Sequence, residues 1–277
     1  MSHVRSAVRE AVADVVTNTA TAGLLVTALI AAALLLGAQT LPYHRYAAAG
    51  LRVAGLLTTL TALTIGVQGH GWVAGADAAT TSWFVAHRSA GFDVAALVIT
   101  DLASPVGTTV VAVMCGALLS WRARSIVPGG VVIGTVAAAA LASTALKAIV
   151  GRSRPPLELQ LILETDHSFP SGHVTGTAAL LGVIAVCAGT GCRPAVRAWL
   201  AAGVVTAVLA IAASRLYLGV HWLTDVTAGA ILGAAFVVAG AAVYGALHPR
   251  PAPDETPPSV RRGAGDGAPM SVLGRES

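Results

Sequence analysis

The stretch IVPGGVVIGTVAAAALASTALKAIVGRSRP, residues 126–155, decides the fold of this chain. It carries no charge from Ile126 to Leu146, which is long enough to cross a bilayer as a helix, because such a helix needs roughly 17–25 residues. The run closes on Lys147, the only lysine of the chain, and Arg154 follows seven residues later. Ionisable side chains at the end of an apolar span are costly to place there and are therefore candidates for function.

The composition supports the same interpretation for the whole chain. Of its 277 residues, 55% are hydrophobic and only 11% are charged, and the mean hydropathy is +0.75. Because a soluble domain typically has about 25% charged residues, we predict an all-α, polytopic membrane helix bundle. Uncharged runs of spanning length occur at 20–39, 53–69, 102–121, 126–146, 174–192, 198–214 and 226–247.

These runs divide the chain into three expected parts. Residues 1–50 form an N-terminal lead-in with one extra transmembrane helix, whose apolar run is longer than the 7–15 residues typical of a signal peptide. Residues 51–247 form a six-helix core, in which the aromatic and charged residues of 70–101 favour short interfacial helices over another span. Residues 248–277 are rich in proline, glycine and charge, which predicts a disordered tail.

Arginine placement predicts the orientation in the membrane. With seven spans, and with Arg154 and Arg215 set aside as candidate ligands, ten arginines lie on one side and four on the other. The larger set comprises Arg45, Arg52, Arg122, Arg124, Arg193, Arg197, Arg250, Arg261, Arg262 and Arg275. The positive-inside rule places that set in the cytoplasm together with the C-terminal tail, and the candidate site on the outer face of the cell membrane. If the first run does not span, the N-terminus changes side.

The net charge of +4 does not indicate a nucleic-acid partner. The arginines flank spans, and no basic cluster is interleaved with aromatic residues. Three cysteines, Cys115, Cys187 and Cys192, lie in or beside apolar runs without metal-ligand spacing, so we expect unpaired structural thiols.

The first candidate block joins Lys147 to Arg154. Their separation corresponds to about two helical turns, roughly 10 Å along a helix axis. Gly151 weakens the helix, and Pro155 biases the residue before it away from helical backbone angles. We therefore expect the chain to leave the helix here and let both cations reach a shared anion. The alternative is that both side chains only snorkel to anchor the helix end.

The second block, Phe169-Pro170-Ser171-Gly172-His173, precedes an apolar run of helix length. Serine is a favoured N-cap, glycine allows close approach of the backbone, and the N–H groups at a helix N-terminus bind anions. His173 would lie on the first turn beside the bound group. The alternative is ordinary capping with an incidental histidine.

The third block, SRLYLGVHWLTD over residues 214–225, ends one span and opens the next. On a helix, His221 and Asp225 would be neighbours on one face. A carboxylate that accepts from one imidazole nitrogen fixes the tautomer and leaves the other nitrogen free to attack. Alternatively, the two side chains only staple the start of a helix.

In order, spacing and position at span ends, these blocks resemble the three-part signature of the type 2 phosphatidic acid phosphatase superfamily. The resemblance covers about residues 51–247. It implies an integral membrane lipid phosphatase that hydrolyses a phosphate mono- or diphosphate ester through a phosphohistidine intermediate. Undecaprenyl diphosphate, another polyprenyl diphosphate, and a phosphatidic acid-like lipid are equally compatible substrates, and the partners expected are this lipid phosphate and membrane lipids, with no obligate protein partner.

The resemblance also implies a role for each matching residue. His221 would attack phosphorus, Asp225 would orient it, and His173 would protonate the leaving oxygen and then activate water. The phosphate would be bound by Lys147, Arg154, Ser171, Gly172 and Arg215. Three cations supply charge for phosphoryl transfer, and no cluster of carboxylates suits Mg²⁺ or Zn²⁺, so we expect no metal and no cofactor.

Two other functions remain open from the sequence. The same phosphohistidine could pass its phosphoryl group to an acceptor other than water. Alternatively, the charged span ends could bind or transport anionic lipid without catalysis, or merely anchor a structural membrane protein. The chain shows no internal repeat typical of transporters, and it differs from the vanadium haloperoxidases, which use a similar ligand set but resemble soluble proteins.

Overall fold

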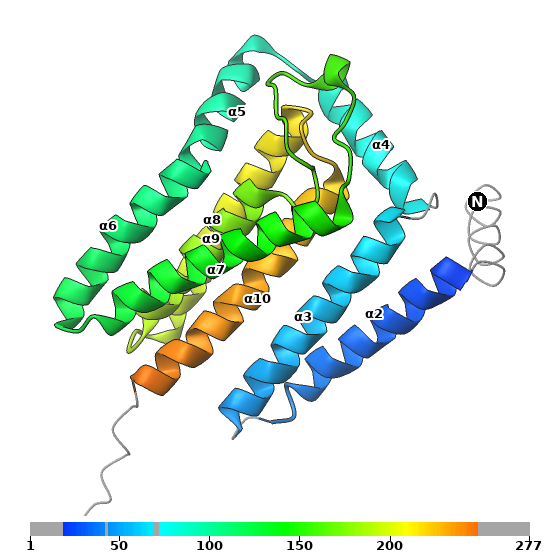
Figure 1. The fold of residues 1–277 in the computed structure, drawn as a ribbon. Helices are drawn as coiled ribbons and strands as arrows, with labels where there is room; N and C mark the ends of the chain where they lie inside the picture. Colours follow the sequence, from blue (N-terminus) through cyan, green and yellow to red (C-terminus); the bar gives the residue numbers. More distant parts are fainter. Residues whose placement is uncertain (1–18, 42–43, 69–71, 249–277) are drawn as a thin grey trace, which may run out of the picture.

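The computed structural model describes residues 19–41, 44–68 and 72–248, and over these ranges the chain is helical throughout with no strand (Figure 1). The all-α prediction is therefore confirmed. Residues 1–18 of the predicted N-terminal part and residues 249–277 of the predicted disordered tail lie outside the described residues.

The helices are α2 (Thr19–Gly37), α3 (Arg45–Gln68), α4 (Trp72–Ala86), α5 (Ala90–Leu102), α6 (Pro105–Ala123), α7 (Val127–Val150), α8 (Gly172–Gly189), α9 (Pro194–Tyr217) and α10 (Leu223–Leu247), with a 3₁₀ turn at Leu157–Leu159. Among the described residues, α3 and α6 to α10 are each long and apolar enough to cross a membrane. Six of the predicted spans are thus confirmed, and the chain is a multi-pass helical membrane protein. The first predicted run becomes α2, which packs along α3 at the margin of the bundle, and its role as a seventh span stays a prediction.

Successive spans run antiparallel, so their connections alternate between two ends of the bundle (Figure 1). The short helices α4 and α5, the segment 151–171 between α7 and α8, and the turn 218–222 between α9 and α10 lie at the same end, hereafter the site end. The expectation of short helices between the first core span and the next is confirmed. All three candidate blocks meet at the site end, as their span-end positions predicted.

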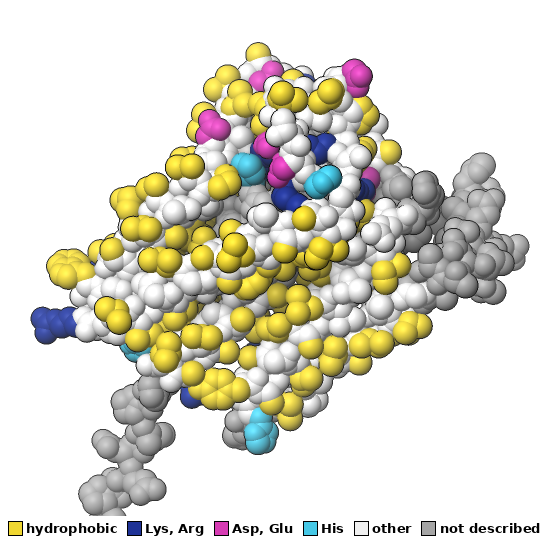
Figure 2. Space-filling view, viewed as in Figure 1, with side chains coloured by type: hydrophobic (Ala, Val, Ile, Leu, Met, Phe, Trp, Pro, Cys, Tyr) yellow, Lys and Arg dark blue, Asp and Glu magenta, His cyan; other side chains and the backbone are white. Residues whose placement is uncertain are grey.

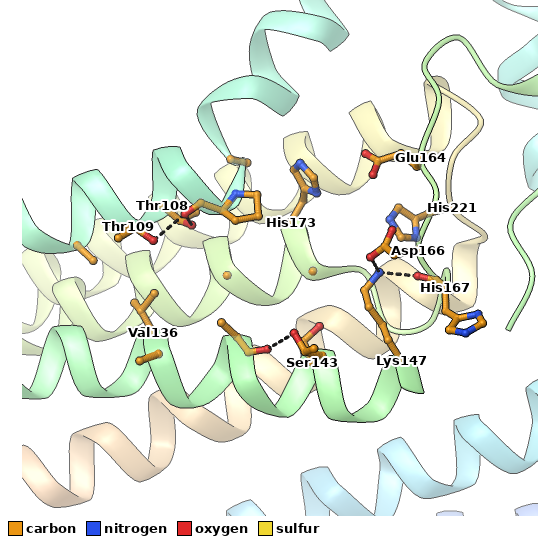
Figure 3. A pocket seen from close by; sticks show the side chains of 18 of the residues that line it. Thr108, Thr109, Val136, Ser143, Lys147, Glu164, Asp166, His167, His173 and His221 are labelled. Carbon is orange, nitrogen blue, oxygen red and sulfur yellow. Dashed lines mark hydrogen bonds and ion pairs between the residues drawn. The ribbon is translucent and has the colours of Figure 1, made fainter. Parts of the chain in front are cut away.

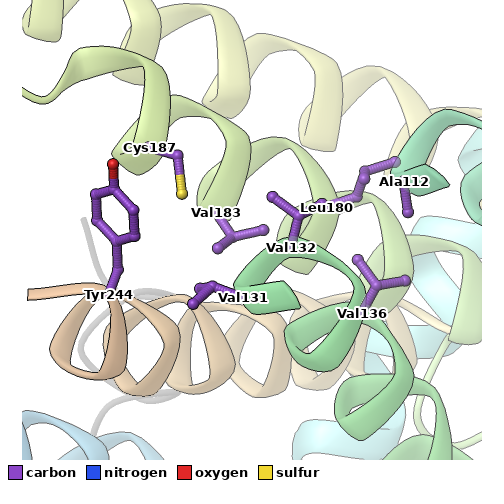
Figure 4. Packing of buried hydrophobic residues seen from close by; sticks show 8 residues of the cluster. All are labelled: Ala112, Val131, Val132, Val136, Leu180, Val183, Cys187 and Tyr244. Carbon is purple, nitrogen blue, oxygen red and sulfur yellow. The ribbon is translucent and has the colours of Figure 1, made fainter. Parts of the chain in front are cut away.

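Close packing of α7, α8 and α10 sets the spacing of the helix ends that carry these blocks. Figure 4 shows Val131, Val132 and Val136 of α7 against Leu180 and Val183 of α8, with Tyr244 of α10 closing the cluster. Small residues allow this approach, which is the usual basis of helix association in membranes. A Cβ on Gly182 would lie 2.3 Å from Val237, and one on Gly233 would lie 2.6 Å from the Cβ of Ala178.

Candidate active site

Charged and histidine side chains gather at the site end over a molecule whose visible face is otherwise mostly apolar or neutral (Figure 2). A cavity of about 830 Å³ lies here, bounded by α6, α7, α8 and the segment 164–167 (Figure 3). The predicted site residues that line it are Lys147, Arg154, Gly172, His173 and His221. The structure therefore brings side chains from all three blocks to one cavity.

The first block forms as expected. Helix α7 ends at Gly151, which adopts a left-handed conformation (φ +63°), so Arg154 lies in the following segment. Lys147 places Nζ 2.7 Å from Oδ2 of Asp166, and Arg154 pairs through Nη2 with Oδ1 of the same carboxylate. The two cations thus reach a shared anion, which in this structure is Asp166.

Arg215 is bound in a similar way by a second acid of the same segment. Its side chain is 1% exposed, and its Nη2 donates to Oε1 of Glu164 at 2.6 Å. A second guanidinium nitrogen, Nη1, donates to Oγ1 of Thr100 at 2.8 Å. Glu164 also lies within 3.8 Å of Arg154 through Oε2. All three predicted phosphate-binding cations are therefore paired with carboxylates of residues 164–166.

The electrostatics of these two acids follow from their partners. Burial by itself would raise the pKa of Asp166, but the hydrogen bonds and charges of Lys147 and Arg154 outweigh it and lower the pKa to about 2. For Glu164, burial is likewise outweighed by Arg215 and Arg154, and its pKa is lowered. Both carboxylates are ionised at neutral pH. Neither acid was predicted as a site residue. Their only signal in the sequence is that they lie between the first two candidate blocks.

The two ring nitrogens of His221 lie beside groups of opposite hydrogen-bonding capacity, a carboxylate and a guanidinium. Its Nδ1 lies 3.4 Å from Oδ2 of Asp225, and its Nε2 lies 3.3 Å from Nη1 of Arg154. An ionised carboxylate only accepts and a guanidinium only donates. The proton of neutral His221 therefore sits on Nδ1, and the Nε2 lone pair faces the cavity side. Burial, reinforced by the nearby arginines, lowers the pKa of His221 well below 6.5 and keeps the ring neutral.

The pairing of His221 with Asp225 differs in origin from the sequence prediction. His221 is not on a helix, because α10 begins at Leu223 after a turn in which Gly219 has φ +72°. Asp225, in the first turn of α10, accepts the backbone N–H of Trp222 at 2.8 Å, and this contact folds the preceding residue back over the carboxylate. The prediction of two neighbours on one helix face was wrong in this detail, although the pair itself forms.

The second block contributes its glycine and histidine to the cavity. His173, on the first turn of α8, lines it without a hydrogen-bond partner in the described part of the chain (Figure 3). Ser171 occupies the N-cap position, but its side chain makes no capping bond, is fully buried and leaves Oγ without a partner among described residues. Ser171, Arg215 and Asp225 do not line the cavity; they stand directly behind its wall.

Two further residues contact the site and were missed from sequence. Arg152 donates to Oδ1 of Asp225 at 2.5 Å and to Oδ2 of Asp77 at 2.6 Å. Arg152 is one of the four arginines that the sequence assigns to the less basic side of the membrane, and Asp77 lies in the region 70–101 predicted to form interfacial helices. The pairing joins α4 to the start of α10 across a long interval of sequence, so no local pattern could reveal it.

Comparison with known proteins agrees with this arrangement. The model of the PAP2 superfamily matches residues 128–248, which include all three blocks. A crystal structure described as a transmembrane PAP2 type phosphatidylglycerolphosphate phosphatase from Bacillus subtilis superimposes with a TM-score of 0.66 at 23% identity, covering 72% of this chain and 98% of that one. This similarity establishes a shared fold. No curated protein matches the chain.

Proposed function

We propose that the chain is an integral membrane phosphatase of lipid phosphates, because residues 128–248 match the model of the PAP2 superfamily and the geometry of the site suits this reaction. The observation that carries the proposal is the setting of His221. A neutral imidazole presents Nε2 beside a guanidinium at the wall of a cavity, and its other nitrogen faces a buried carboxylate. This is the arrangement that nucleophilic attack on phosphorus requires.

Phosphate binding follows from the cations around that nitrogen. Lys147, Arg154 and Arg215 converge on the two carboxylates of residues 164–166, so the same groups can hold the oxygens of a phosphate. The N–H groups that open α8 at Gly172 add an anion site without side-chain charge. Together these donors would stabilise the charge on the equatorial oxygens during transfer.

The proposed reaction has two steps. Nε2 of His221 forms a bond to phosphorus while the bond to the leaving oxygen breaks, and His173 donates a proton to that oxygen. Asp225 stabilises the positive charge that the phosphorylated imidazole acquires. His173, now neutral, removes a proton from water, which attacks phosphorus and releases phosphate and free His221.

The shape of the cavity supports a lipid substrate. From its charged end it continues between α6 and α7, where its wall consists of apolar or small side chains such as Val113, Ile133, Val136 and Ala140. A polar head against the cations and an apolar chain along this wall would both be accommodated. Polyprenyl diphosphates and phosphatidic acid-like lipids fit equally, and the structural relative's phosphatidylglycerolphosphate is a third candidate. We place the site on the outer face, following the arginine distribution.

Phosphotransfer to an acceptor other than water uses the same intermediate and is the second candidate. Hydrolysis is favoured because the carboxylate of Asp166, which lines the charged end of the cavity, is 55% exposed, so that water can reach this end. Inorganic phosphate as the product separates the two possibilities.

The test is phosphate release by the purified full-length protein in detergent with excess EDTA, using undecaprenyl diphosphate, phosphatidic acid and phosphatidylglycerolphosphate at equal surface concentration. His221→Gln should abolish release while retaining phosphate affinity. His87→Gln is the matched control, since His87 is exposed just after the end of α4 and its side chain hydrogen-bonds only to the Trp83 carbonyl. A ³²P label on the wild-type protein that survives alkali but not acid would identify phosphohistidine. Unchanged turnover in His221→Gln, or activity lost in EDTA and restored by Mg²⁺, would contradict the mechanism.

A further inference from the structure

Arg152 lies between two buried carboxylates, outside the cavity. Asp225 is 0% exposed and Asp77 is 2% exposed, and the Arg152 guanidinium bonds to one oxygen of each. Buried carboxylates are rare and costly without a charged partner. Neither Arg152 nor Asp77 lines the cavity, and both Nη atoms of Arg152 are already bonded to Asp225, Thr224 and Asp77.

The two oxygens of Asp225 contact different partners. Oδ1 accepts a hydrogen bond from Arg152, whereas Oδ2 accepts the Trp222 N–H and faces Nδ1 of His221. Because a carboxylate is planar, fixing Oδ1 fixes the direction in which Oδ2 points. Arg152 therefore sets the orientation of the acid that sets the orientation of His221.

Arg152 is itself held on several sides. Its Nη1 also bonds to Oγ1 of Thr224 at 2.7 Å, and its guanidinium lies 5.5 Å from the centre of the Trp222 ring. Asp77 accepts from Arg152, and its two oxygens also accept the backbone N–H and the hydroxyl of Thr224. The contacts tie α4 to the first turn of α10 and leave Arg152 little freedom.

Charge balance explains why a second acid is needed. A single guanidinium beside Asp225 would form a neutral pair and cancel much of the negative charge that His221 needs. Asp77 adds a second negative charge, so the group Asp77–Arg152–Asp225 retains one net negative charge next to the imidazole. That charge favours the cationic ring formed when Nε2 bonds to phosphorus.

We propose that Arg152 and Asp77 are positioning residues of this site: together they orient Asp225 toward His221 and preserve the net negative charge behind the nucleophile. The inference rests on the proposed phosphatase function and adds two residues to its machinery, one of them from α4. They act on the chemical step through Asp225, and not on the binding of phosphate.

The test compares Arg152→Lys, Arg152→Gln and Asp77→Asn in the full-length protein. We measure kcat for the best lipid substrate and, separately, the affinity for inorganic phosphate by calorimetry. In metal sites, groups that orient a ligating histidine typically contribute about 10- to 100-fold, and we expect a similar factor for His221. We expect kcat to fall by about that factor in Arg152→Gln and Asp77→Asn, and less in Arg152→Lys, with phosphate affinity within about twofold of wild type. Arg122→Lys is the control and should leave kcat unchanged, because Arg122 is exposed in the last turn of α6, at the opposite end of the bundle from the site end.

A double-mutant cycle distinguishes positioning from general destabilisation. If Arg152 and Asp77 act as a unit, Arg152→Lys combined with Asp77→Asn should lose little more activity than the more impaired single variant. Losses that multiply, a parallel drop in phosphate affinity, or wild-type kcat in folded Asp77→Asn would overturn the inference. Should Arg152→Gln fail to fold, the isosteric Asp77→Asn and charge-conserving Arg152→Lys decide the question. Phosphate binding without turnover in the wild-type protein would instead contradict the proposed function.

Discussion

Asp166 accepts a hydrogen bond of 2.7 Å from Nζ of Lys147 and also pairs with Arg154. Glu164 forms an ion pair with Arg215. The two carboxylates thus bind all three cations that the proposed function assigns to phosphate. Under the proposed function, a substrate phosphate would have to displace these two carboxylates. The ion pairs would keep the buried cations paired when no substrate is bound, and they would lower the affinity for substrate.

Removing these carboxylate charges should strengthen phosphate binding. For Asp166→Asn we expect the dissociation constant of inorganic phosphate to fall by about two- to fivefold, the range of an ion pair with an exposed partner. Glu164→Gln should act in the same direction and at least as strongly, because its partner Arg215 is buried. Glu158→Gln, an exposed acid of the same segment with no ion pair among the described residues, is the control. Calorimetric titration measures the effect, and weaker binding in Asp166→Asn would argue that this acid builds the site instead of competing for it.

The apolar part of the cavity should select for chain length. Ala140→Trp would fill the wall of α7 and displace part of a lipid chain, and each lost methylene contact is worth about 0.8 kcal/mol. We expect kcat/KM for a long-chain substrate to fall by about tenfold or more relative to a water-soluble short-chain phosphate. Leu141→Trp is the control, because Leu141 is 72% exposed on the same helix and outside the cavity. Equal losses for long and short substrates in Ala140→Trp would place the lipid chain elsewhere.

The pH dependence should reflect the neutral state of His221. Its pKa lies well below 6.5 because of burial and the nearby Arg215, Arg154 and Lys147. As pH falls, the folded protein therefore loses its nucleophile only well below 6.5, and kcat/KM should not show an acid limb at 6.5. The measurement is kcat/KM against pH, divided by the fraction of substrate phosphate in each ionisation state from ³¹P NMR. An acid limb of kcat/KM at or above pH 6.5 would mean that burial and the nearby cations do not lower the pKa of His221, and would contradict the prediction.

Gly219 should be intolerant of any side chain. It adopts φ +72°, and a Cβ would lie 2.1 Å from the carbonyl oxygen of Leu159 in the segment that carries the site acids. Gly191 is the matched comparison, with φ +81° but no atom within 4 Å of a Cβ. Gly191→Ala should cost about 1–2 kcal/mol in the free energy of unfolding from backbone strain alone, and Gly219→Ala should cost more and lower turnover. Thermal unfolding in detergent and phosphate release measure the two effects. Equal destabilisation of the two variants would mean that the segment around Leu159 moves away from the added Cβ without loss of free energy.

Much of the fold could be predicted because the bilayer imposes a local rule. A run such as 126–146 must satisfy its backbone hydrogen bonds within one helix, so length and apolarity alone identify the span. The same alternation of spans correctly brought the three blocks to one end. Boundaries were less accurate: α3 begins at Arg45, well before the apolar run, because arginine and tyrosine at its start are compatible with a helix at the membrane surface.

Only those site residues could be predicted that belong to blocks with a characteristic order and spacing along the chain. Lys147, Arg154, His173 and His221 could be grouped because the order and spacing of their blocks resemble a known signature, and the structure places them around one cavity. The partners of these residues were not accessible in the same way. Glu164, Asp166 and Arg152 lie in a connecting segment where sequence restricts conformation weakly.

The sequence by itself therefore determined the membrane spans, the end at which the blocks gather and the chemical types of the site residues, because each depends on local hydrophobicity and spacing. Tertiary structure alone decided which charges pair. Asp77 meets Arg152 and Asp225, and Asp166 meets Lys147 and Arg154, only after helices and segments distant in sequence have packed. The physical reason is that a buried charge is stabilised by whichever opposite charge the fold brings within a few ångströms, whatever their separation along the chain.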